Sequence, residues 1–140
     1  ELTQDEQITM MTLWCIFRSP LMIGGELTKL DAFTLRLLTN EGILAMHKNA
    51  RHAHPVWRRK IAGSEIALWT AVSCQGGQYV AVFNIGEQDC EISIPLADLE
   101  LEGPAQCVEL WTGSASSIQS EISLRLPKHA AAAYLIAQNQ

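Results

Sequence analysis

Acidic side chains are the first candidates for chemistry in this sequence, because two carboxyl groups at a suitable separation can act as a catalytic acid and a base or nucleophile. Asp5 and Glu6 are adjacent, but they follow Thr3 at the start of a helical pattern. There the Thr3 hydroxyl and the Glu6 carboxylate can form a capping box, and both acids favour the positive end of the helix dipole. The pair therefore predicts the start of a helix and not an acid–base site.

Histidines are the next candidates, because imidazole is a common zinc ligand. His47, His52 and His54 lie within eight residues, but their spacing matches no motif with a known mechanism. We therefore expect no metal ion and no cofactor. His129, at the start of a strand-like run, is interpreted as structural. The cationic side chains that would repel a metal ion near the first three histidines are Lys48, Arg51, Arg58, Arg59 and Lys60.

Tryptophan rings could stack on sugars, so their positions bear on carbohydrate binding. Trp69 and Trp111 stand in strand-like runs among apolar neighbours, which favours packing in a core. Trp57 stands in a charged junction, and we expect it to pack between two structural units. The sequence therefore predicts structural roles for all three rings.

The sequence has four cysteines, Cys15, Cys74, Cys90 and Cys107. None belongs to a CxxC pair, and each is flanked by apolar or strand-like residues, so buried free thiols are the favoured interpretation. A disulfide between neighbouring strands, such as Cys74 with Cys90, is the alternative. The sequence shows no Ser/His/Asp arrangement for nucleophilic catalysis and no glycine-rich phosphate-binding motif.

The composition is that of a globular chain, with 48% hydrophobic and 18% charged residues and a mean hydropathy of +0.07. No apolar run approaches the roughly 20 residues of a membrane-spanning helix, and the first residues lack a signal-peptide pattern. The prediction is a soluble protein, in the cytoplasm or secreted or periplasmic. Residues 1–60 carry eight Lys and Arg against six Asp and Glu, and residues 61–140 carry two against nine. This balance argues against nucleic-acid binding.

The first third of the chain has helical periodicity interrupted by one short apolar run. A helix is expected from Thr3 until Ser19-Pro20 stops it, followed by a strand at Leu21-Met22-Ile23. Asp31 can cap a second helix, which Asn40 and Gly42 divide. The apolar residues that recur at three- and four-residue steps in the first helix are Ile8, Met10, Met11, Trp14, Cys15 and Phe17.

From about Trp57 onward the period of the pattern changes to two. Short runs such as QYVAVFNIG and SEISLRLP are rich in β-branched and aromatic residues and are separated by turn signals. Six or more such strands with hairpin-length links predict an antiparallel sandwich or barrel. The charged segment 47–60, which contains Pro55, is interpreted as the junction, with the domain boundary between residues 50 and 60.

Several motifs occur in an order that is specific when they are taken together. In that order they resemble glycoside hydrolase family 27, the family of α-galactosidases and α-N-acetylgalactosaminidases. The N-terminal motifs resemble the end of the catalytic barrel in that family, and the C-terminal motifs resemble the β-sandwich that follows it. The motifs are Leu13-Trp14, Ser19-Pro20-Leu21, Gly24, Leu27, Leu38-Thr39-Asn40 and Ile43-Leu44-Ala45, then EIALWTAV, GGQYVAVFNIGE, IPLADLEL, VELWTG and LPKHAAAAYLIA.

The resemblance implies that residues 21–23 are the eighth strand of a (β/α)₈ barrel, which is buried on both faces. It also implies removal of a terminal α-linked galactose-type sugar with retention of configuration. That reaction needs two carboxyl groups about 5–5.5 Å apart. In the family both are aspartates on the fourth and sixth barrel strands, and both positions would precede Glu1. We therefore predict no catalytic residue in this chain, so that the parent protein is the hydrolase and the chain alone is inactive.

The resemblance gives Glu26 a candidate role, because it follows a barrel-type strand at the end where such enzymes place their sites. We predict Gly25 and Glu26 as substrate-binding residues on the barrel rim. The alternative is a solvated acid beside a tight turn. The family tends to have Asp before Leu here, so Glu26 keeps a carboxylate on a longer side chain. The segment 47–50 also departs from the family, which often has an Asn-Gln-Asp-Pro-like turn there.

The resulting prediction is an α+β fragment in two parts. Residues 1–55 form the last helix, strand and helix of the barrel, and residues 56–140 form an antiparallel β-sandwich. The partner expected for the parent enzyme is an α-galactoside-type oligosaccharide or glycoconjugate, with no nucleic acid and no membrane. Apolar residues around 21–23 and Trp14 would lack partners, which predicts self-association or contact with parent segments. The alternative function is a stand-alone β-sandwich, carbohydrate-binding module with a helical extension.

Overall fold

The structure is a computed structural model that describes residues 3–16 and 40–138. The predicted strand at 21–23, the Asp31 cap and the candidate site residues Gly25 and Glu26 lie outside the described residues. Within these described ranges, two helices precede the strands, α1 (Gln4–Ile16) and α3 (Glu41–Asn49). The strands are β1 (Ala50–Ile61), β2 (Ser64–Ser73), β3 (Gln78–Asn84), β4 (Cys90–Pro95), β5 (Ala105–Glu109), β6 (Ala115–Ile118), β7 (Glu121–Leu126) and β8 (Ala131–Gln138), with the 3₁₀ helix η2 (Leu96–Leu99) after β4.

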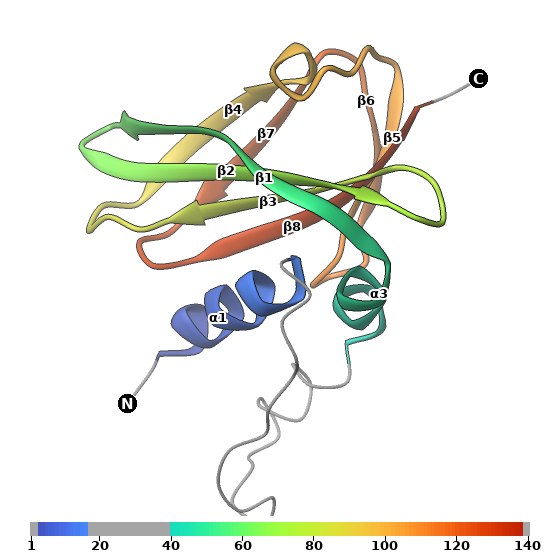
Figure 1. The fold of residues 1–140 in the computed structure, drawn as a ribbon. Helices are drawn as coiled ribbons and strands as arrows, with labels where there is room; N and C mark the ends of the chain where they lie inside the picture. Colours follow the sequence, from blue (N-terminus) through green and yellow to red (C-terminus); the bar gives the residue numbers. More distant parts are fainter. Residues whose placement is uncertain (1–2, 17–39, 139–140) are drawn as a thin grey trace, which may run out of the picture.

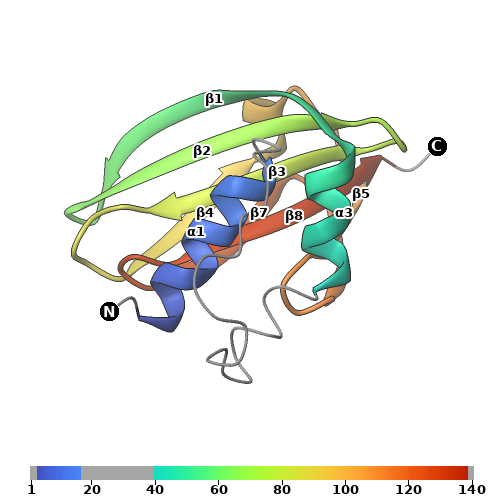
Figure 2. The same ribbon diagram turned by 60° about the horizontal axis from the view of Figure 1, so that its bottom comes forward.

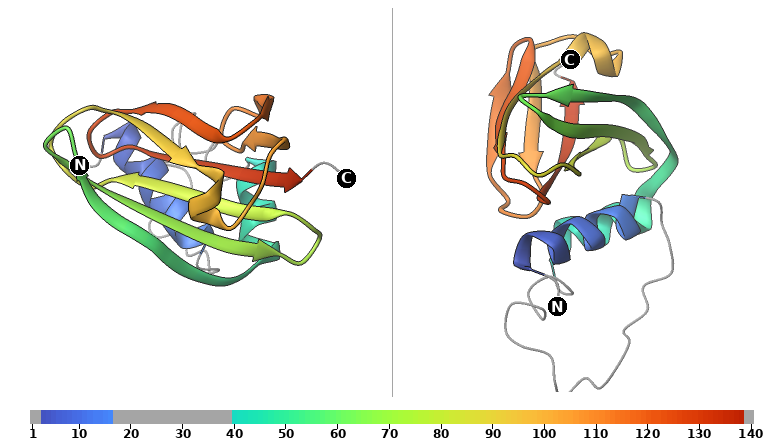
Figure 3. Two further views of the ribbon diagram at one scale, coloured as in Figure 1. Left: turned by 90° about the horizontal axis from the view of Figure 1, so that it is seen from above. Right: turned by 90° about the vertical axis from the view of Figure 1, so that its left-hand side faces the viewer.

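The strands form two antiparallel sheets that face each other. The larger sheet has the order β1-β2-β3-β8-β5-β6, and the smaller one consists of β4 and β7 (Figure 1). The helices lie on the side of the larger sheet that is turned away from β4 and β7 (Figure 3, right). The predicted antiparallel sandwich preceded by helices is therefore confirmed. Neither described helix is long and apolar enough to cross a lipid bilayer.

Both described helices begin at side-chain caps, of which the sequence predicts the first. The Thr3 backbone N–H donates to Glu6 Oε1 at 2.9 Å, and the Glu6 N–H donates to Thr3 Oγ1 at 3.1 Å, which is a complete capping box. Asn40 is the N-cap of α3, and its Oδ1 accepts from the Ile43 N–H at 2.9 Å. Asn40 therefore marks the start of a helix, in agreement with its predicted role as a break in the helical pattern.

The first strand occupies the segment that the sequence analysis treated as a junction. Helix α3 ends at Asn49 and β1 follows directly, and among the described strands it pairs with β2 alone. As an edge strand β1 carries charged side chains and Pro55, and its pairing shifts register on both sides of the His54–Pro55 pair. His52 has a φ of 57° at the first shift. Charges, proline and bulges are the features with which edge strands resist further pairing, and they erase the period-two pattern.

The larger sheet is buried on both faces, which explains why its central strands are apolar without alternation. Along β2, Ile66 and Leu68 face β4 and β7, whereas Ala67 and Trp69 face the helices. We call the first cluster the sandwich core and the second the helix-facing core. The large, fully buried residues of the sandwich core are Ile66, Leu68, Val80, Val82, Ile94, Leu96 and Ile136, and those of the helix-facing core include Ile16, Ile43, Met46 and Tyr79.

Asn84 connects the two sheets at the end nearest the start of α1. Its side chain is fully buried, and Nδ2 donates to the carbonyls of Gln88 at 2.7 Å and Leu126 at 3.0 Å. Its Oδ1 accepts from Ser64 Oγ at 2.7 Å and from the Gly86 N–H at 3.1 Å. All hydrogen-bonding groups of this amide are thus satisfied, so it stabilises the β3–β4 turn against β7.

Candidate functional site

The described histidines do not gather into a metal site. His54 Nδ1 lies 2.9 Å from the His52 carbonyl oxygen on β1, and His47 lies on α3. Within residues 3–16 and 40–138, no group of three or more His, Cys, Asp or Glu is arranged to hold a metal ion. His129 instead contacts two carboxylates, as described below.

The three described tryptophans are all partly buried, but they lie on different faces of the sheet. Trp69 and Trp111 pack against the helix-facing core, which confirms their predicted packing role. Trp57 packs against the sandwich core, so the expectation that it lies between the two units is wrong. It faces inward because it pairs with Leu68 after the register shift in β1. Its Nε1 donates to Asp98 Oδ2 at 3.1 Å, and the Arg59 guanidinium lies 4.2 Å from its ring centroid.

The cysteines are free thiols, and three of the four are buried. Burial raises the pKa of Cys15 to about 12 and the pKa of Cys107 to about 11, so both stay protonated at neutral pH. Cys74 is exposed in the β2–β3 turn, which differs from the prediction of burial. The alternative disulfide between Cys74 and Cys90 is not formed.

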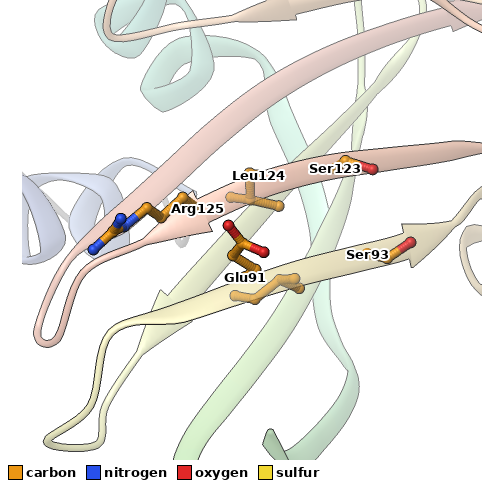
Figure 4. Close-up of a pocket in the computed structure, with 6 residues that line it drawn as sticks. Glu91, Ser93, Ser123, Leu124 and Arg125 are labelled. Carbon is orange, nitrogen blue, oxygen red and sulfur yellow. The ribbon is translucent and has the colours of Figure 1, made fainter. Parts of the chain in front are cut away.

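A shallow pocket of about 470 Å³ lies on the β4–β7 pair, away from the helices (Figure 4). Glu91 stands opposite Arg125 and Ser93 opposite Ser123 in the strand register. In Figure 4 the Glu91 carboxylate points toward Leu124, whereas the Arg125 guanidinium points away from it. The lining offers hydroxyls and one carboxylate for hydrogen bonds, but it has neither the second carboxylate for glycoside hydrolysis nor an aromatic ring for sugar stacking.

The two described helices cover one face of the larger sheet. Figure 2 shows α1 and α3 side by side across this face. Helix α1 contacts β8, β3 and β1, and α3 contacts β2. At the alanine positions of this face the strand carries only a methyl group, which leaves room for the helices to pack closely. The alanines of the helix-facing core are Ala50, Ala67, Ala71, Ala81 and Ala133.

Helix α1 is apolar on more than one side. Met11, Cys15 and Ile16 are buried against the sheet, while Leu13, on another side of the helix, is 39% exposed. Met10 is half-buried. A surface helix of a complete globular unit usually has a single apolar stripe and a polar opposite face. Helix α1 instead keeps an apolar side chain, Leu13, on a side that the sheet does not cover.

Trp111 joins both helices to the loop after β5. Its Nε1 donates to Thr12 Oγ1 at 2.8 Å, and the Thr12 hydroxyl donates to the Ile8 carbonyl at 2.7 Å. The Trp111 carbonyl accepts from Asn40 Nδ2 at 3.1 Å, next to the start of α3. These bonds fix the two helices relative to each other and to the sheet. The sequence placed Trp111 in a core but carried no signal for its polar partners, which lie up to 99 positions away.

A second connection between α1 and the sandwich is ionic. His129, in the β7–β8 turn, has its Nδ1 3.1 Å from Glu6 Oε2 and its Nε2 2.7 Å from Glu87 Oε2. Glu6 belongs to the first turn of α1, and Glu87 belongs to the β3–β4 turn. The two carboxylates raise the pKa of His129, with the hydrogen bond to Glu87 as the largest cause. We call Glu6, His129 and Glu87 the carboxylate–histidine cluster.

Comparison with known proteins identifies the sandwich. The family profile described as the α-galactosidase C-terminal β-sandwich domain matches residues 63–136, from the β1–β2 turn to β8 and just over half of the chain. The chain belongs to this family. Its strands β2 to β8 are thus the sandwich of an α-galactosidase-type C-terminal domain, and the resemblance inferred from the sequence motifs is confirmed.

Solved structures extend the similarity to the helices. A GH27 β-L-arabinopyranosidase from Geobacillus stearothermophilus is 39% identical, with a TM-score of 0.90 over 98% of this chain and 31% of that one. The α-galactosidase MEL1 from Saccharomyces cerevisiae shares the fold at 18% identity, with a TM-score of 0.84 over 99% of this chain and 44% of that one. The helix–sheet arrangement of the α-galactosidase-type domain is therefore part of the common fold.

Sequence comparison also links the chain to curated enzymes of greater length. The α-galactosidase D of Emericella nidulans is 29% identical over 110 residues, which are 79% of this chain and 17% of that protein. The α-galactosidase mel1 of Schizosaccharomyces pombe is 21% identical, and the match covers 89% of this chain and 30% of that protein. The chain thus spans less than a third of each of these relatives.

Proposed function

We propose that this chain is the C-terminal part of a retaining glycoside hydrolase that removes terminal α-linked galactose-type sugars. In this proposal the sandwich and its two helices brace the catalytic barrel, and the catalytic aspartates belong to barrel strands that precede residue 1. Membership of the α-galactosidase C-terminal sandwich family supports the proposal. The 39% identity to a GH27 enzyme over 98% of this chain supports it further.

The single observation that carries the bracing role is that α1 has an apolar residue on its outer side as well as on the side packed on the sheet. On its inner side, Met11, Cys15 and Ile16 are buried against the sheet. On its outer side, Leu13 is exposed. An apolar outer side next to an established core suits a further layer of protein, and in the proposed parent that layer is the rest of the barrel. Gly25 and Glu26 keep their proposed place on the rim of the barrel, where Glu26 would accept hydrogen bonds from sugar hydroxyls.

The sugar itself has two candidates within one chemical class. L-Arabinopyranose has the ring stereochemistry of D-galactopyranose without the exocyclic CH₂OH group, so β-L-arabinopyranosides and α-D-galactopyranosides present the same ring hydroxyls and the same leaving-group orientation. The curated relatives named above are α-galactosidases, which favours galactose. The identity of 39% to a β-L-arabinopyranosidase favours arabinose as the second candidate.

The test is hydrolysis by the complete product of the gene that encodes this chain. We expect it to release p-nitrophenol from the α-D-galactopyranoside or the β-L-arabinopyranoside, with retention of configuration in the first-formed sugar. We expect the 140-residue chain to release none from either compound, since the proposed carboxylate pair is not part of it. Hydrolysis by the 140-residue chain would contradict the proposal, and a start codon directly before residue 1 would support a stand-alone binding module instead.

The isolated chain should also associate through the apolar surface that the barrel would cover in the proposed parent enzyme. We propose that it self-associates or binds parent segments through the outer side of α1, where Leu13 is exposed. Sedimentation velocity of the purified 140-residue chain tests this point, with Leu13→Ser as the variant and Ile85→Ser, at a second exposed apolar residue, as the control. A monomer at all concentrations would contradict the idea.

A further inference from the structure

The carboxylate–histidine cluster joins three segments that are far apart in the sequence. The first turn of α1 supplies Glu6, the β3–β4 turn supplies Glu87 and the β7–β8 turn supplies His129. In Figures 1 and 2 these three segments meet at the end of the molecule where α1 begins. The exposed fractions of the side chains are 31% for Glu6, 73% for Glu87 and 32% for His129, so water reaches all three groups.

The arrangement around the imidazole requires a particular protonation state. A neutral imidazole has one N–H group, and its other nitrogen is an acceptor, which would face a carboxylate that can only accept. In this structure both ring nitrogens lie within hydrogen-bond distance of a carboxylate oxygen, at 3.1 Å and 2.7 Å. Only the imidazolium ion can donate to both carboxylates at the same time.

The backbone of His129 is attached to α1 as well. Its carbonyl oxygen accepts from Thr9 Oγ1 at 2.7 Å, one turn of helix after Glu6. His129 has a φ of 62°, in the left-handed region, so the turn presents its ring and its carbonyl to the helix at one point. The next residue, Ala130, is held by the Asn84 N–H at 2.9 Å, which ties this turn to β3. Movement of the His129 ring is therefore linked to the packing of α1 on the sheet.

We propose that His129 makes the docking of α1 on the sandwich sensitive to pH. The imidazolium ion holds the first turn of α1 to the β3–β4 and β7–β8 turns through both carboxylates, and loss of its proton releases one of the two contacts. The helix then stays attached through Thr9 and its apolar side but opens more often at its N-terminal end. The inference concerns α1 and the sandwich within this chain and does not depend on the proposed glycosidase activity.

The remaining charged groups at this end define the electrostatic setting. Asp5 stands beside Glu6 in the first turn of α1. Asp89 accepts from the Lys128 N–H at 3.0 Å and pairs with Arg125 at 3.3 Å, so these charges are largely balanced among themselves. The charges that face the ring directly are the two carboxylates of the cluster, and both favour its protonated form.

The pH window follows from the directions of the shifts. The pKa of His129 is raised above its ordinary value of 6.5, so its contribution is complete below pH 6.5 and is lost as the pH rises through the higher folded value. The pKa of Glu6 is lowered from 4.5, first by the Thr3 backbone N–H and also by His129. The Glu6 contribution is therefore complete above pH 4.5 and is lost as the pH falls through the lower folded value. Both contributions are complete between pH 4.5 and pH 6.5, so α1 is held most tightly to the sandwich in that range.

The test combines a histidine titration with amide exchange in the 140-residue chain. Imidazole resonances of ¹⁵N-labelled protein give the titration midpoint of His129, which we expect above 6.5. Glu87→Gln and Glu6→Gln should each lower it. Glu102→Gln removes the same charge from an exposed side chain between η2 and β5, at the opposite end of the sandwich (Figure 1), and should leave the midpoint unchanged.

Hydrogen exchange of the α1 amides then reports on docking. After correction for intrinsic exchange, the opening constant of the first turns of α1 should rise about two- to fivefold as the pH passes through the His129 midpoint, the range expected for exposed ion pairs. The rise should be absent in His129→Gln, while β2 and β3 amides should show none in either protein. Two results with the unmodified chain would overturn the inference. One is a His129 titration midpoint at or below 6.5, and the other is an α1 opening constant that does not change as His129 loses its proton.

Discussion

Replacing Ile43 with alanine tests whether the helices are an integral part of the fold. Ile43 has no exposed surface and belongs to the helix-facing core, although α3 is only nine residues long. The substitution removes three buried carbon groups, which is about 2.4 kcal/mol at about 0.8 kcal/mol each. A residual cavity adds roughly 1 kcal/mol, and the better helix propensity of alanine returns a few tenths. We expect a net loss of about 3 kcal/mol in the free energy of unfolding.

The assay is urea unfolding followed by far-ultraviolet circular dichroism. We expect the midpoint to fall while the denaturant slope m stays the same, because the surface exposed on unfolding hardly changes. Val72→Ala is the matched control, since Val72 lies on β2 of the same sheet and is 52% exposed. It should cost less than about 1 kcal/mol.

The sign of the change in unfolding free energy shows whether α3 is packed on the sheet. If α3 were detached from the sheet in solution, Ile43 would be exposed, and Ile43→Ala would change only helix propensity, for which alanine is slightly better. An unchanged or raised unfolding free energy would therefore refute the packing described here, whatever the absolute stability of the chain.

Three further substitutions or modifications probe particular contacts. Asn84→Ala should lower the unfolding free energy by about 3 kcal/mol, because it leaves the buried Leu126 carbonyl, the partly buried Gln88 carbonyl and the Ser64 hydroxyl without their partner; chemical denaturation measures this, and a loss below about 1 kcal/mol would contradict it. Thr12→Val should cost roughly 1–2 kcal/mol by removing the acceptor of the Trp111 indole N–H, with a shift in tryptophan fluorescence as the second readout. A thiol reagent should modify Cys74 rapidly in the native chain and the other three cysteines only after unfolding, and fast modification of all four would show that the cores are open.

The period-two pattern of the sequence predicted the antiparallel strands, but not that helices cover one face of the larger sheet. A period of two identified β4 and β7, where apolar and exposed residues alternate strictly in Cys90–Pro95. The near-continuous apolar run of β3 is explained by a sheet with cover on both faces, and that cover comes from helices that precede it by some 30 residues or more. Strand β1 escaped prediction because its edge position allows charges, a proline and shifts of register.

The contacts that join α1 to the sandwich were beyond local patterns. Thr3 and Glu6 were predictable as a cap, because a capping box lies within four residues. The second partner of Glu6 is His129, and the ring of Trp111 reaches Thr12 across most of the chain. Pairs of this kind depend on topology, which brings the β7–β8 turn and the loop after β5 to the same helix. The helix cap and the family resemblance were therefore predictable from the sequence, but the contacts of Glu6 with His129 and of Trp111 with Thr12 were not.

In the proposed parent enzyme, the outer side of α1 is an interface with the rest of a catalytic barrel. The most direct measurement is an experimental structure of the complete product of the gene that encodes this chain. We expect residues preceding Glu1 to form a barrel that covers Leu13 and reduces its exposed fraction from 39% to near zero. A structure in which Leu13 stays in contact with solvent, or in which no barrel precedes the sandwich, would contradict it.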